Sequence, residues 1–139
     1  MKKKVIGYTA GTFDMFHIGH LNLIKNAKSR CDYLIVGVNS DRLVEEYKGK
    51  KVVVPIEERM EIIRALRFVD DVVCVDSLDK KIAWNQMHYD FLFIGDDWKG
   101  NPRWEATAAE MKQLGVETVF LPHTEGTNST LLREKLVEY

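Results

Sequence analysis

The chain has 139 residues, the size of one domain with a hydrophobic core of its own. Hydrophobic residues make up 45% and charged residues 29%, as in ordinary soluble globular proteins, and the formal net charge is −1. This charge argues against a nucleic-acid partner, because such proteins carry a basic surface. The sequence shows neither a signal-peptide hydrophobic region nor an apolar run of membrane-spanning length, so we expect a cytoplasmic protein with no membrane partner.

Strand and helix patterns alternate along the whole chain. Short, mostly apolar runs typical of strands buried on both faces lie at 5–8, 33–38, 72–75, 91–94 and 117–121. Helical spacing of apolar residues occupies 19–29, 56–66, 80–87 and 103–114, with a last helix at 129–137. The alternation predicts a single α/β domain, residues 1–139, with a Rossmann-like, doubly wound sheet of five parallel strands. Ligands of such sheets bind beyond the carboxyl ends of the strands.

The most informative stretch comes directly after the first strand. It reads Gly11-Thr12-Phe13-Asp14 and, after two further residues, His17-Ile18-Gly19-His20. The stretch lies on a strand-to-helix turn, where the first N–H groups of a helix lack partners and attract phosphate oxygens. Both imidazoles can face one anion there, and Gly19 lets a ligand approach the backbone. We predict a phosphate site, and the absence of GxGxxG separates it from the dinucleotide-binding type.

Two neighbours of the histidines have open roles. Asp14 could hold a substrate hydroxyl or help to position a metal, and it could instead satisfy local backbone donors. The hydroxyl of Thr12 could reach a phosphate or stabilise the turn. A zinc site at the histidines is not favoured, because no nearby Cys or further His completes a tetrahedral set and Asp14 alone is insufficient.

Three later segments carry further candidates. The segment 39–55, predicted to be a loop, contains Lys48-Gly49-Lys50-Lys51, whose flexible charges could swing onto a triphosphate or could simply be solvated. Gly95-Asp96-Asp97-Trp98 follows the fourth strand, where carboxylates can bind ribose or polyol hydroxyls or form an exposed turn. The segment 122–130 leads into the last helix, whose start could form a second anion cradle or a plain capped surface helix.

Taken in order, these segments resemble the signatures of the HxGH nucleotidyltransferase superfamily, and specifically its cytidylyltransferase branch. The HxGH motif corresponds to His17-Ile18-Gly19-His20, and Arg59 and Arg67 match an ERxxxI helix followed by RxVD. The GDDW segment corresponds to 95–98 and an RTEGxST segment to 123–130. The resemblance covers residues 5 to about 136, and it implies this branch's fold and chemistry.

The resemblance also implies roles for individual residues. The expected catalytic residues are His17, His20 and Lys48. Residues expected to bind the nucleotide and its phosphates are Thr12, Phe13, Gly19, Asp96, His123, Thr124, Gly126, Ser129 and Thr130. Residues expected on the acceptor side are Asp14, Arg67, Asp97 and Trp98, with Arg67 shaping either the site or a dimer contact and Arg59 acting structurally. No residue is expected to bind a metal directly.

The implied reaction is transfer of CMP from CTP, with Mg²⁺, to a phosphorylated small alcohol. Glycerol 3-phosphate is the expected acceptor, which would give CDP-glycerol for cell-surface polysaccharides, and pyrophosphate would leave. The alternatives are ethanolamine phosphate or another polyol phosphate as the acceptor, adenylyl transfer within the same superfamily, and a non-catalytic nucleotide sensor. The relatives form homodimers, so we expect a homodimer.

Two positions depart from the pattern of these relatives. His123 stands where they carry Arg, and a His is only partly charged near neutral pH, so triphosphate affinity is expected to be lower or dependent on pH. Leu78 stands where related enzymes often have a Trp, and losing an aromatic wall weakens recognition of a quaternary ammonium. Choline phosphate is therefore a poor candidate for the acceptor.

Overall fold

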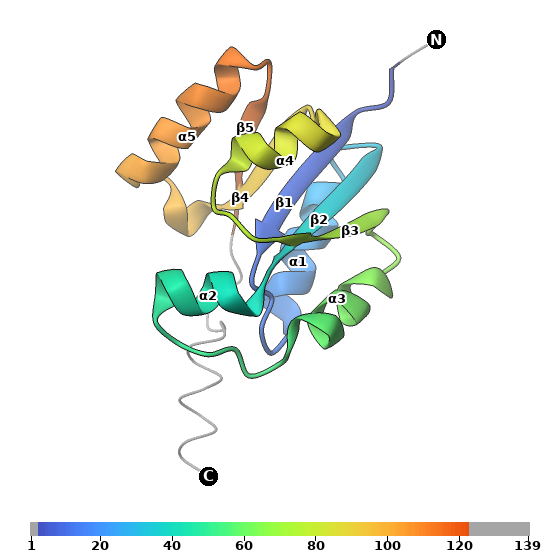
Figure 1. The fold of residues 1–139 in the computed structure, drawn as a ribbon. Coiled ribbons are helices and arrows are strands. Elements are labelled where there is room, and N and C mark those ends of the chain that lie inside the picture. Colours follow the sequence, from blue (N-terminus) through green and yellow to red (C-terminus); the bar gives the residue numbers. More distant parts are fainter. Residues whose placement is uncertain (1–2, 123–139) are drawn as a thin grey trace.

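The computed structural model describes residues 3–122, and Figure 1 shows how their helices and strands are arranged. In chain order the elements are β1 (Ile6–Gly11), α1 (Ile18–Lys28), β2 (Tyr33–Asn39), α2 (Asp41–Lys48), α3 (Ile56–Arg64), β3 (Asp71–Val75), α4 (Lys80–Met87), β4 (Phe91–Gly95), the 3₁₀ turn η1 (Asp96–Trp98), α5 (Pro102–Gln113) and β5 (Glu117–Leu121). The helix predicted at 129–137 lies outside the described residues. No helix in residues 3–122 has the length and apolar character needed to cross a membrane.

The five strands form one parallel sheet in the order β3-β2-β1-β4-β5, so the predicted Rossmann-like sheet is confirmed. Strand β1 is central and pairs with β2 from Ile6↔Tyr33 to Gly11↔Val38, which brings the ends of the two strands side by side. The chain moves outward from β1 to β3 and then returns to β4 on the other side of β1. The carboxyl ends of β1 and β4 therefore flank the reversal in strand order, where such sheets bind ligands.

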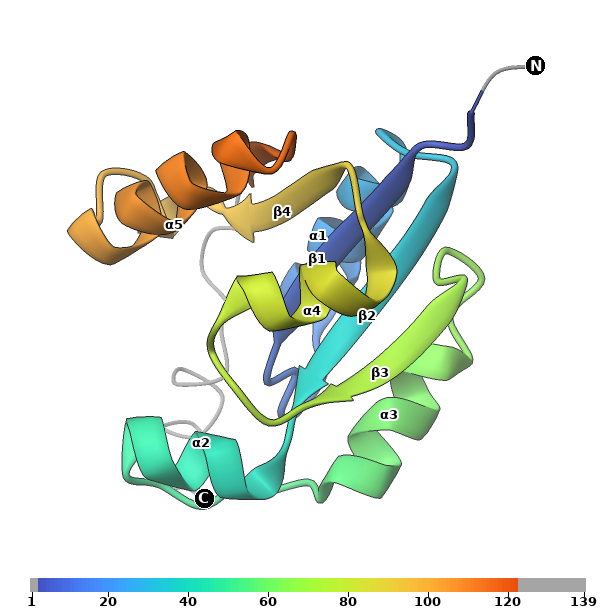
Figure 2. The ribbon, with the colours of Figure 1, turned by 45° about the horizontal axis from the view of Figure 1, so that its top comes forward.

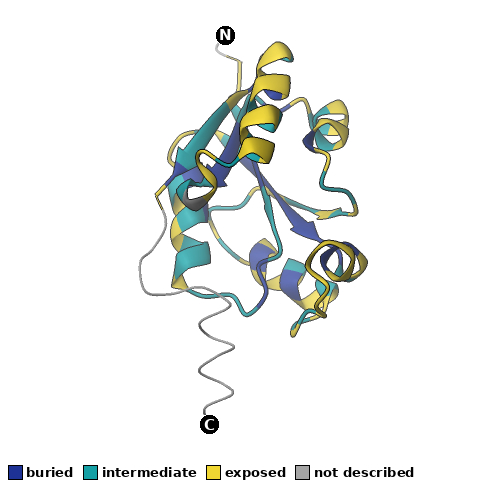
Figure 3. Ribbon diagram, turned by 90° about the vertical axis from the view of Figure 1, so that its left-hand side faces the viewer, coloured by how far each residue is buried: buried dark blue, intermediate teal, exposed yellow. Residues whose placement is uncertain are grey.

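Helices cover both faces of the sheet (Figure 2). On one face Ile24 of α1 and Ile63 of α3 pack against Val36 and other strand residues. On the opposite face Met111 of α5 packs against Leu92, and α4 contributes partly buried apolar residues. Figure 3 shows buried residues concentrated in the strands and exposed residues on the outer sides of the helices, as expected for parallel strands covered on both faces.

Residues 41–48, predicted to be part of a loop, form the helix α2 near the carboxyl ends of β1 and β2 (Figure 1). The Oγ of Ser40 caps the start of α2 by accepting the N–H of Leu43 at 3.2 Å. Gly49 ends the helix in the left-handed region, at φ +66°. The loop prediction was wrong here because only Leu43 and Val44 are buried on α2, too few apolar residues for a recognisable helical period.

Candidate active site

The two predicted histidines begin helix α1 and cap it with their own side chains. The Nδ1 of His17 accepts the N–H of Gly19 at 3.0 Å, and the Nδ1 of His20 accepts the N–H of His17 at 3.3 Å. The pair forms a reciprocal capping box, and the ring centroids are 3.8 Å apart. The N–H of Gly19, predicted to be open to phosphate, therefore already has a partner.

These hydrogen bonds determine which nitrogen of each ring carries a proton. A neutral imidazole has one acceptor and one donor nitrogen, and because Nδ1 accepts in both rings, Nε2 carries the N–H. Burial lowers the pKa of His17; burial, followed by the charges of His17 and Lys48, lowers the pKa of His20 to about 3 against the opposing effect of Asp14. Both rings are thus neutral donors at pH 7. Within residues 3–122 the buried Nε2 of His17 has no hydrogen-bond partner, so it is available to an acceptor on a ligand.

The turn between β1 and α1 holds His20 in place. Phe13 and Met15 adopt φ of +52° and +50°, a region that non-glycine residues occupy only where the surrounding structure enforces it. The ring of Phe13 is buried in the core, and its centroid lies 5.4 Å from that of His20 at a steep angle. Phe16 packs against His20 at the same centroid distance. The side chain of Phe13, predicted to contact the nucleotide, is thus taken up by the core and by His20.

Asp14 anchors a distant segment to this turn. Its two carboxylate oxygens accept the main-chain N–H groups of Val53 and Val54, each at 2.8 Å. The side chain is buried, so these are charge-assisted hydrogen bonds shielded from water. Of the roles considered for Asp14, the structure matches the satisfaction of backbone donors, although the donors come from 39 and 40 residues away instead of from the local helix start.

Arg59 connects the turn with two further segments. Its guanidinium donates to the main-chain oxygens of Thr12 and Asn39, each at 2.7 Å, and to that of Val54 at 2.8 Å. It also pairs with the carboxylate of Asp41 at the start of α2. The side chain is fully buried, so the structural role predicted for Arg59 is confirmed.

Lys48 reaches the turn from the end of α2 and not from a loop. Its Nζ lies 3.5 Å from the Oγ1 of Thr12. Two residues that the sequence analysis did not identify complete this cluster, because the Oη of Tyr47 lies 3.1 Å from the Oγ1 of Thr12 and the Nδ2 of Asn39 donates to the same atom at 3.4 Å. Neither Asn39 nor Tyr47 belongs to a sequence motif. The two residues come together because the folded chain places α2 beside the ends of the strands.

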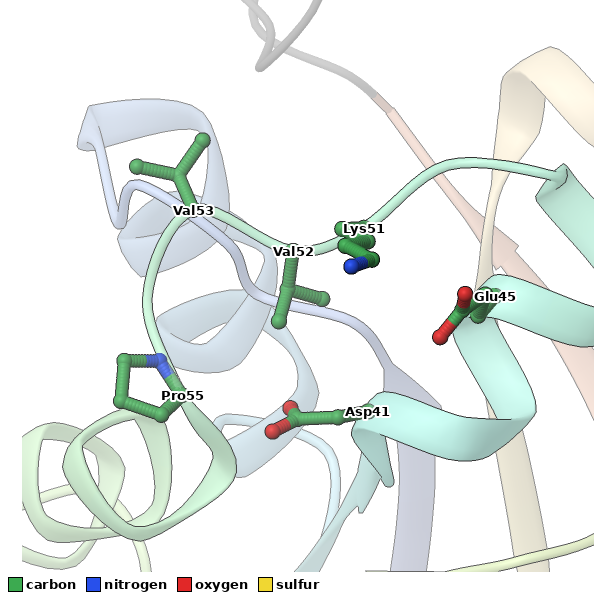
Figure 4. A pocket seen from close by; sticks show the side chains of 6 residues that line it. All are labelled: Asp41, Glu45, Lys51, Val52, Val53 and Pro55. Atoms are coloured by element: carbon green, nitrogen blue, oxygen red, sulfur yellow. The ribbon is translucent and has the colours of Figure 1, made fainter.

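A cavity of about 330 Å³ lies between α2 and the segment that follows it. Figure 4 shows its lining: Asp41, Glu45, Lys51, Val52, Val53 and Pro55. Two carboxylates against one ammonium do not favour a triphosphate, because like charges repel at short range. We therefore do not include this cavity in the candidate site.

The segment after β4 lies at the same edge of the sheet as the histidines. Asp96, Asp97 and Trp98 form the turn η1 directly beyond the carboxyl end of β4, as the strand order predicts for a ligand-binding segment. The ring of Trp98 is exposed, and its centroid lies 6.3 Å from that of Trp104 on α5.

Lys80, also missed by the sequence analysis, is a buried cation at the start of α4. Its side chain is only 7% exposed, and its Nζ lies 5.5 Å from the centroid of Trp104. Burial, followed by the nearby charge of Arg103, lowers the pKa of Lys80 to about 8. None of the salt bridges among the described residues includes Lys80. A buried ammonium of this kind favours an anionic ligand, and no sequence signal marks it, because its burial depends on α5.

Other predicted site residues lie elsewhere or outside the described part of the chain. Arg67 is exposed and precedes β3, which places it at the amino edge of the sheet, opposite the histidines. Its Cζ lies 5.0 Å from the ring centroid of Phe68. Arg67 therefore does not reach the candidate site of its own chain. Outside the described residues lie His123, Thr124, Gly126, Ser129 and Thr130.

A Rossmann-like sheet with paired imidazole donors at its first strand-to-helix turn is the arrangement of a nucleotidyltransferase. The comparisons with known proteins narrow this class. A family model described as cytidylyltransferase-like matches residues 8–135. The chain belongs to this cytidylyltransferase-like family.

The chain is also similar to individual proteins and to a solved structure. The chain is 36% identical to a glycerol-3-phosphate cytidylyltransferase of Bacillus spizizenii over 135 residues, covering 96% of this chain and 97% of that protein. It is also 30% identical to an FAD synthase of Thermococcus sibiricus, covering 99% of this chain and 95% of that protein. A lipopolysaccharide core biosynthesis protein of Thermoplasma volcanium has the same fold, with a TM-score of 0.75 at 22% identity, covering 90% of this chain and 100% of that one.

Proposed function

We propose that the protein transfers a cytidylyl group from CTP to glycerol 3-phosphate and releases pyrophosphate. The observation that carries this proposal is the Nε2–H of His17, a buried donor with no partner among the described residues at the phosphate-binding edge of the sheet. The family and the similarity to a glycerol-3-phosphate cytidylyltransferase support the choice of nucleotide and acceptor.

The proposed mechanism needs no covalent intermediate. An oxygen of the acceptor phosphate attacks the α-phosphorus of CTP, and a new P–O bond forms while the bond to the β-phosphate oxygen breaks. No general base is required, because the acceptor phosphate is already ionised near neutral pH. The Nε2–H donors of His17 and His20 and the ammonium of Lys48 would stabilise the negative charge that develops on the phosphoryl oxygens.

The surroundings of Lys80 support an anionic acceptor without a cationic group. The buried ammonium of Lys80 would pair with the acceptor's phosphate. The ring of Trp104 already lies near two cations, Lys80 at 5.5 Å and Arg103 at 5.9 Å, whose like charge would repel an added ammonium group. This favours glycerol 3-phosphate over ethanolamine phosphate, and it agrees with the Leu78 departure that disfavours choline phosphate.

Further features of the proposal concern the metal, the assembly and the cell. Among residues 3–122 no group of three or more His, Cys, Asp or Glu side chains is placed to hold a metal ion, so Mg²⁺ would enter with CTP, held largely by the triphosphate oxygens and neutralising their charge. We propose a homodimer in the cytoplasm, where the free thiols of Cys31 and Cys74 would stay reduced. The product CDP-glycerol would supply cell-surface polysaccharide synthesis.

The test is a matrix of four nucleoside triphosphates against glycerol 3-phosphate, ethanolamine phosphate and other polyol phosphates, with Mg²⁺, scored by product mass. We expect CDP-glycerol to dominate. An adenylylated product would replace the proposal with adenylyl transfer, and CDP-ethanolamine would replace the acceptor with ethanolamine phosphate. If no combination gives a product, the remaining alternative is a non-catalytic nucleotide sensor. His17→Ala should lower kcat by at least about a hundredfold, because a preplaced donor to the transition state is lost.

A further inference from the structure

Four polar side chains from three separate segments meet beside the histidine turn. This Thr12 cluster consists of Thr12, which follows β1, Asn39 at the end of β2, and Tyr47 and Lys48 in the last turn of α2. The Oγ1 of Thr12 is common to three of its contacts: Tyr47 Oη at 3.1 Å, Asn39 Nδ2 at 3.4 Å and Lys48 Nζ at 3.5 Å. The cluster therefore connects the ammonium expected to act in the reaction with the turn that carries the imidazoles.

Asn39 is the fixed point of the Thr12 cluster. Its side chain is 5% exposed, and its main-chain oxygen accepts from the buried guanidinium of Arg59. The two protons on Nδ2 serve both hydroxyls, since Nδ2 also donates to Tyr47 Oη at 3.3 Å. The hydroxyl of Tyr47 is thereby held at a defined place, although 39% of its side chain is exposed.

Lys48 depends on its neighbours for a defined position. The residue is exposed, and a lysine side chain has a long flexible stem that samples many rotamers in water. Its two contacts within the cluster are the Oγ1 of Thr12 and the ring of Tyr47, whose centroid lies 5.5 Å from Nζ. The second contact requires the ring of Tyr47 to stay where its hydroxyl is bound, and the first is made to the same Oγ1 that lies 3.1 Å from that hydroxyl.

We propose that Tyr47, held by Asn39, is a positioning residue that aims the ammonium of Lys48 at the phosphoryl group being transferred. The inference rests on the proposed function, and it adds a residue pair that acts on the reaction only by fixing the position of Lys48. It requires that removing the Tyr47 hydroxyl loosens Lys48 and slows the reaction while leaving the fold intact.

The first test uses no substrate, so it is independent of the proposed function. NMR relaxation of the lysine Cε groups compares the wild-type protein with Tyr47→Phe, which keeps the ring and removes the hydroxyl. Tyr33→Phe is the matched control, because Tyr33 has a similar lysine, Lys4, 5.4 Å from its ring centroid at the far edge of the sheet. We expect the order parameter of Lys48 to fall only in Tyr47→Phe. An unchanged order parameter overturns the proposal, whether or not the protein transfers CMP.

The second test is a double-mutant cycle on the reaction. Tyr47→Phe should lower kcat about tenfold and leave KM for CTP within about twofold of the wild-type value. The reason is that the ammonium of Lys48, which acts in the transition state, is no longer held in position. In a Lys48→Ala background the same change should have no further effect. A kcat for Tyr47→Phe close to that of wild type, an equal loss in both backgrounds, or a raised KM for CTP with unchanged kcat would each overturn the positioning role. If the wild-type protein lacks activity, the proposed function fails. The relaxation result alone then decides whether Tyr47 positions Lys48.

Discussion

The capping box at the start of α1 forms only when Nδ1 of both imidazoles is unprotonated. Each Nδ1 must accept a main-chain N–H, and protonation of that nitrogen breaks the hydrogen bond. The donors that we propose for phosphate binding and the helix cap are thus the same two side chains, which would tie the chemistry of this turn to its stability.

This arrangement predicts a loss of stability in acid. The pKa of His20 falls from an ordinary 6.5 to about 3, mainly through burial, so below pH 6.5 the unfolded chain binds a proton that the folded chain does not. The free energy of unfolding should therefore decline as the pH falls from 6.5 toward 3. Urea titrations at a series of pH values should show this decline in the wild type and a shallower one in His20→Gln, since Gln keeps a capping-box acceptor but does not titrate.

A histidine elsewhere provides the control for this titration. His88 ends α4 in the left-handed region, which Asn tolerates well, so His88→Asn should retain the wild-type decline. If the free energy of unfolding of His20→Gln declines in acid as steeply as that of the wild type, His20 is not the group that the fold keeps neutral.

Lys80 predicts a different effect at alkaline pH. Burial lowers its pKa to about 8, so its charge, and with it the attraction for an acceptor phosphate, should be lost above that pH. We expect kcat/KM for glycerol 3-phosphate to fall about tenfold per pH unit above 8. Lys80→Arg should keep the charge, and the profile should stay flat to about pH 10, while the exposed Lys81→Arg should behave as the wild type. Identical profiles for all three proteins would remove Lys80 from the acceptor site.

At the scale of the element, helix α2 is short and is fixed mainly by its ends and its links to other segments. Ser40 caps its start, Asp41 pairs with Arg59, and Arg42 donates to the main-chain oxygen of Asp76 at 2.9 Å. Only two of its eight residues are buried. The position of Lys48, its last residue, therefore depends on how the helix is terminated.

Gly49 is the terminating residue, and its substitution gives a specific prediction. Its φ is +66°, and a Cβ placed there would meet no atom of residues 3–122 within 4 Å, so we expect the cost of a side chain to be backbone strain. Gly49→Ala should reduce the free energy of unfolding by about 1 kcal/mol, measured by urea denaturation. Gly49→Asn should lose less, because Asn tolerates the left-handed region. If Ala and Asn lower the free energy of unfolding equally, the left-handed φ of Gly49 is not the source of the cost.

At the scale of the whole molecule, the sheet separates the predicted site residues into two groups. His17 and the residues around it lie at the carboxyl edge, and Arg67 lies at the amino edge. Any effect of Arg67 on catalysis must therefore be transmitted through a second copy of the chain or through the fold as a whole.

This separation leads to a prediction on assembly. We expect sedimentation equilibrium to give twice the mass of one chain, and Arg67→Ala to shift the equilibrium toward the monomer, because an exposed arginine lying against Phe68 suits an interface. Arg64→Ala is the matched control, since Arg64 is an exposed arginine three residues earlier, at the end of α3, and its salt bridge within residues 3–122 is with Glu61. A wild-type monomer, or the same shift in both variants, would contradict the role of Arg67 in a dimer.

Local pattern was sufficient for much of the architecture. Four of the helices and all five strands in the described part of the chain lie within a few residues of their predicted positions, because each has several apolar residues at the period of its element. The exception, α2, has two buried residues and is held by caps and long-range ion pairs, which leave little trace in hydrophobic periodicity.

The sequence by itself determined the sheet, the edge at which we expect a ligand to bind and the histidine pair, because strand alternation and the spacing of His17 and His20 are properties of neighbouring residues. Only the tertiary structure decided the tautomers of the rings, the role of Asp14 as an anchor for Val53 and Val54, the burial of Lys80 and the distance of Arg67 from the site. Each of these depends on segments far apart in the chain. Hydrogen bonding and burial across such separations are set by packing, which no local pattern records.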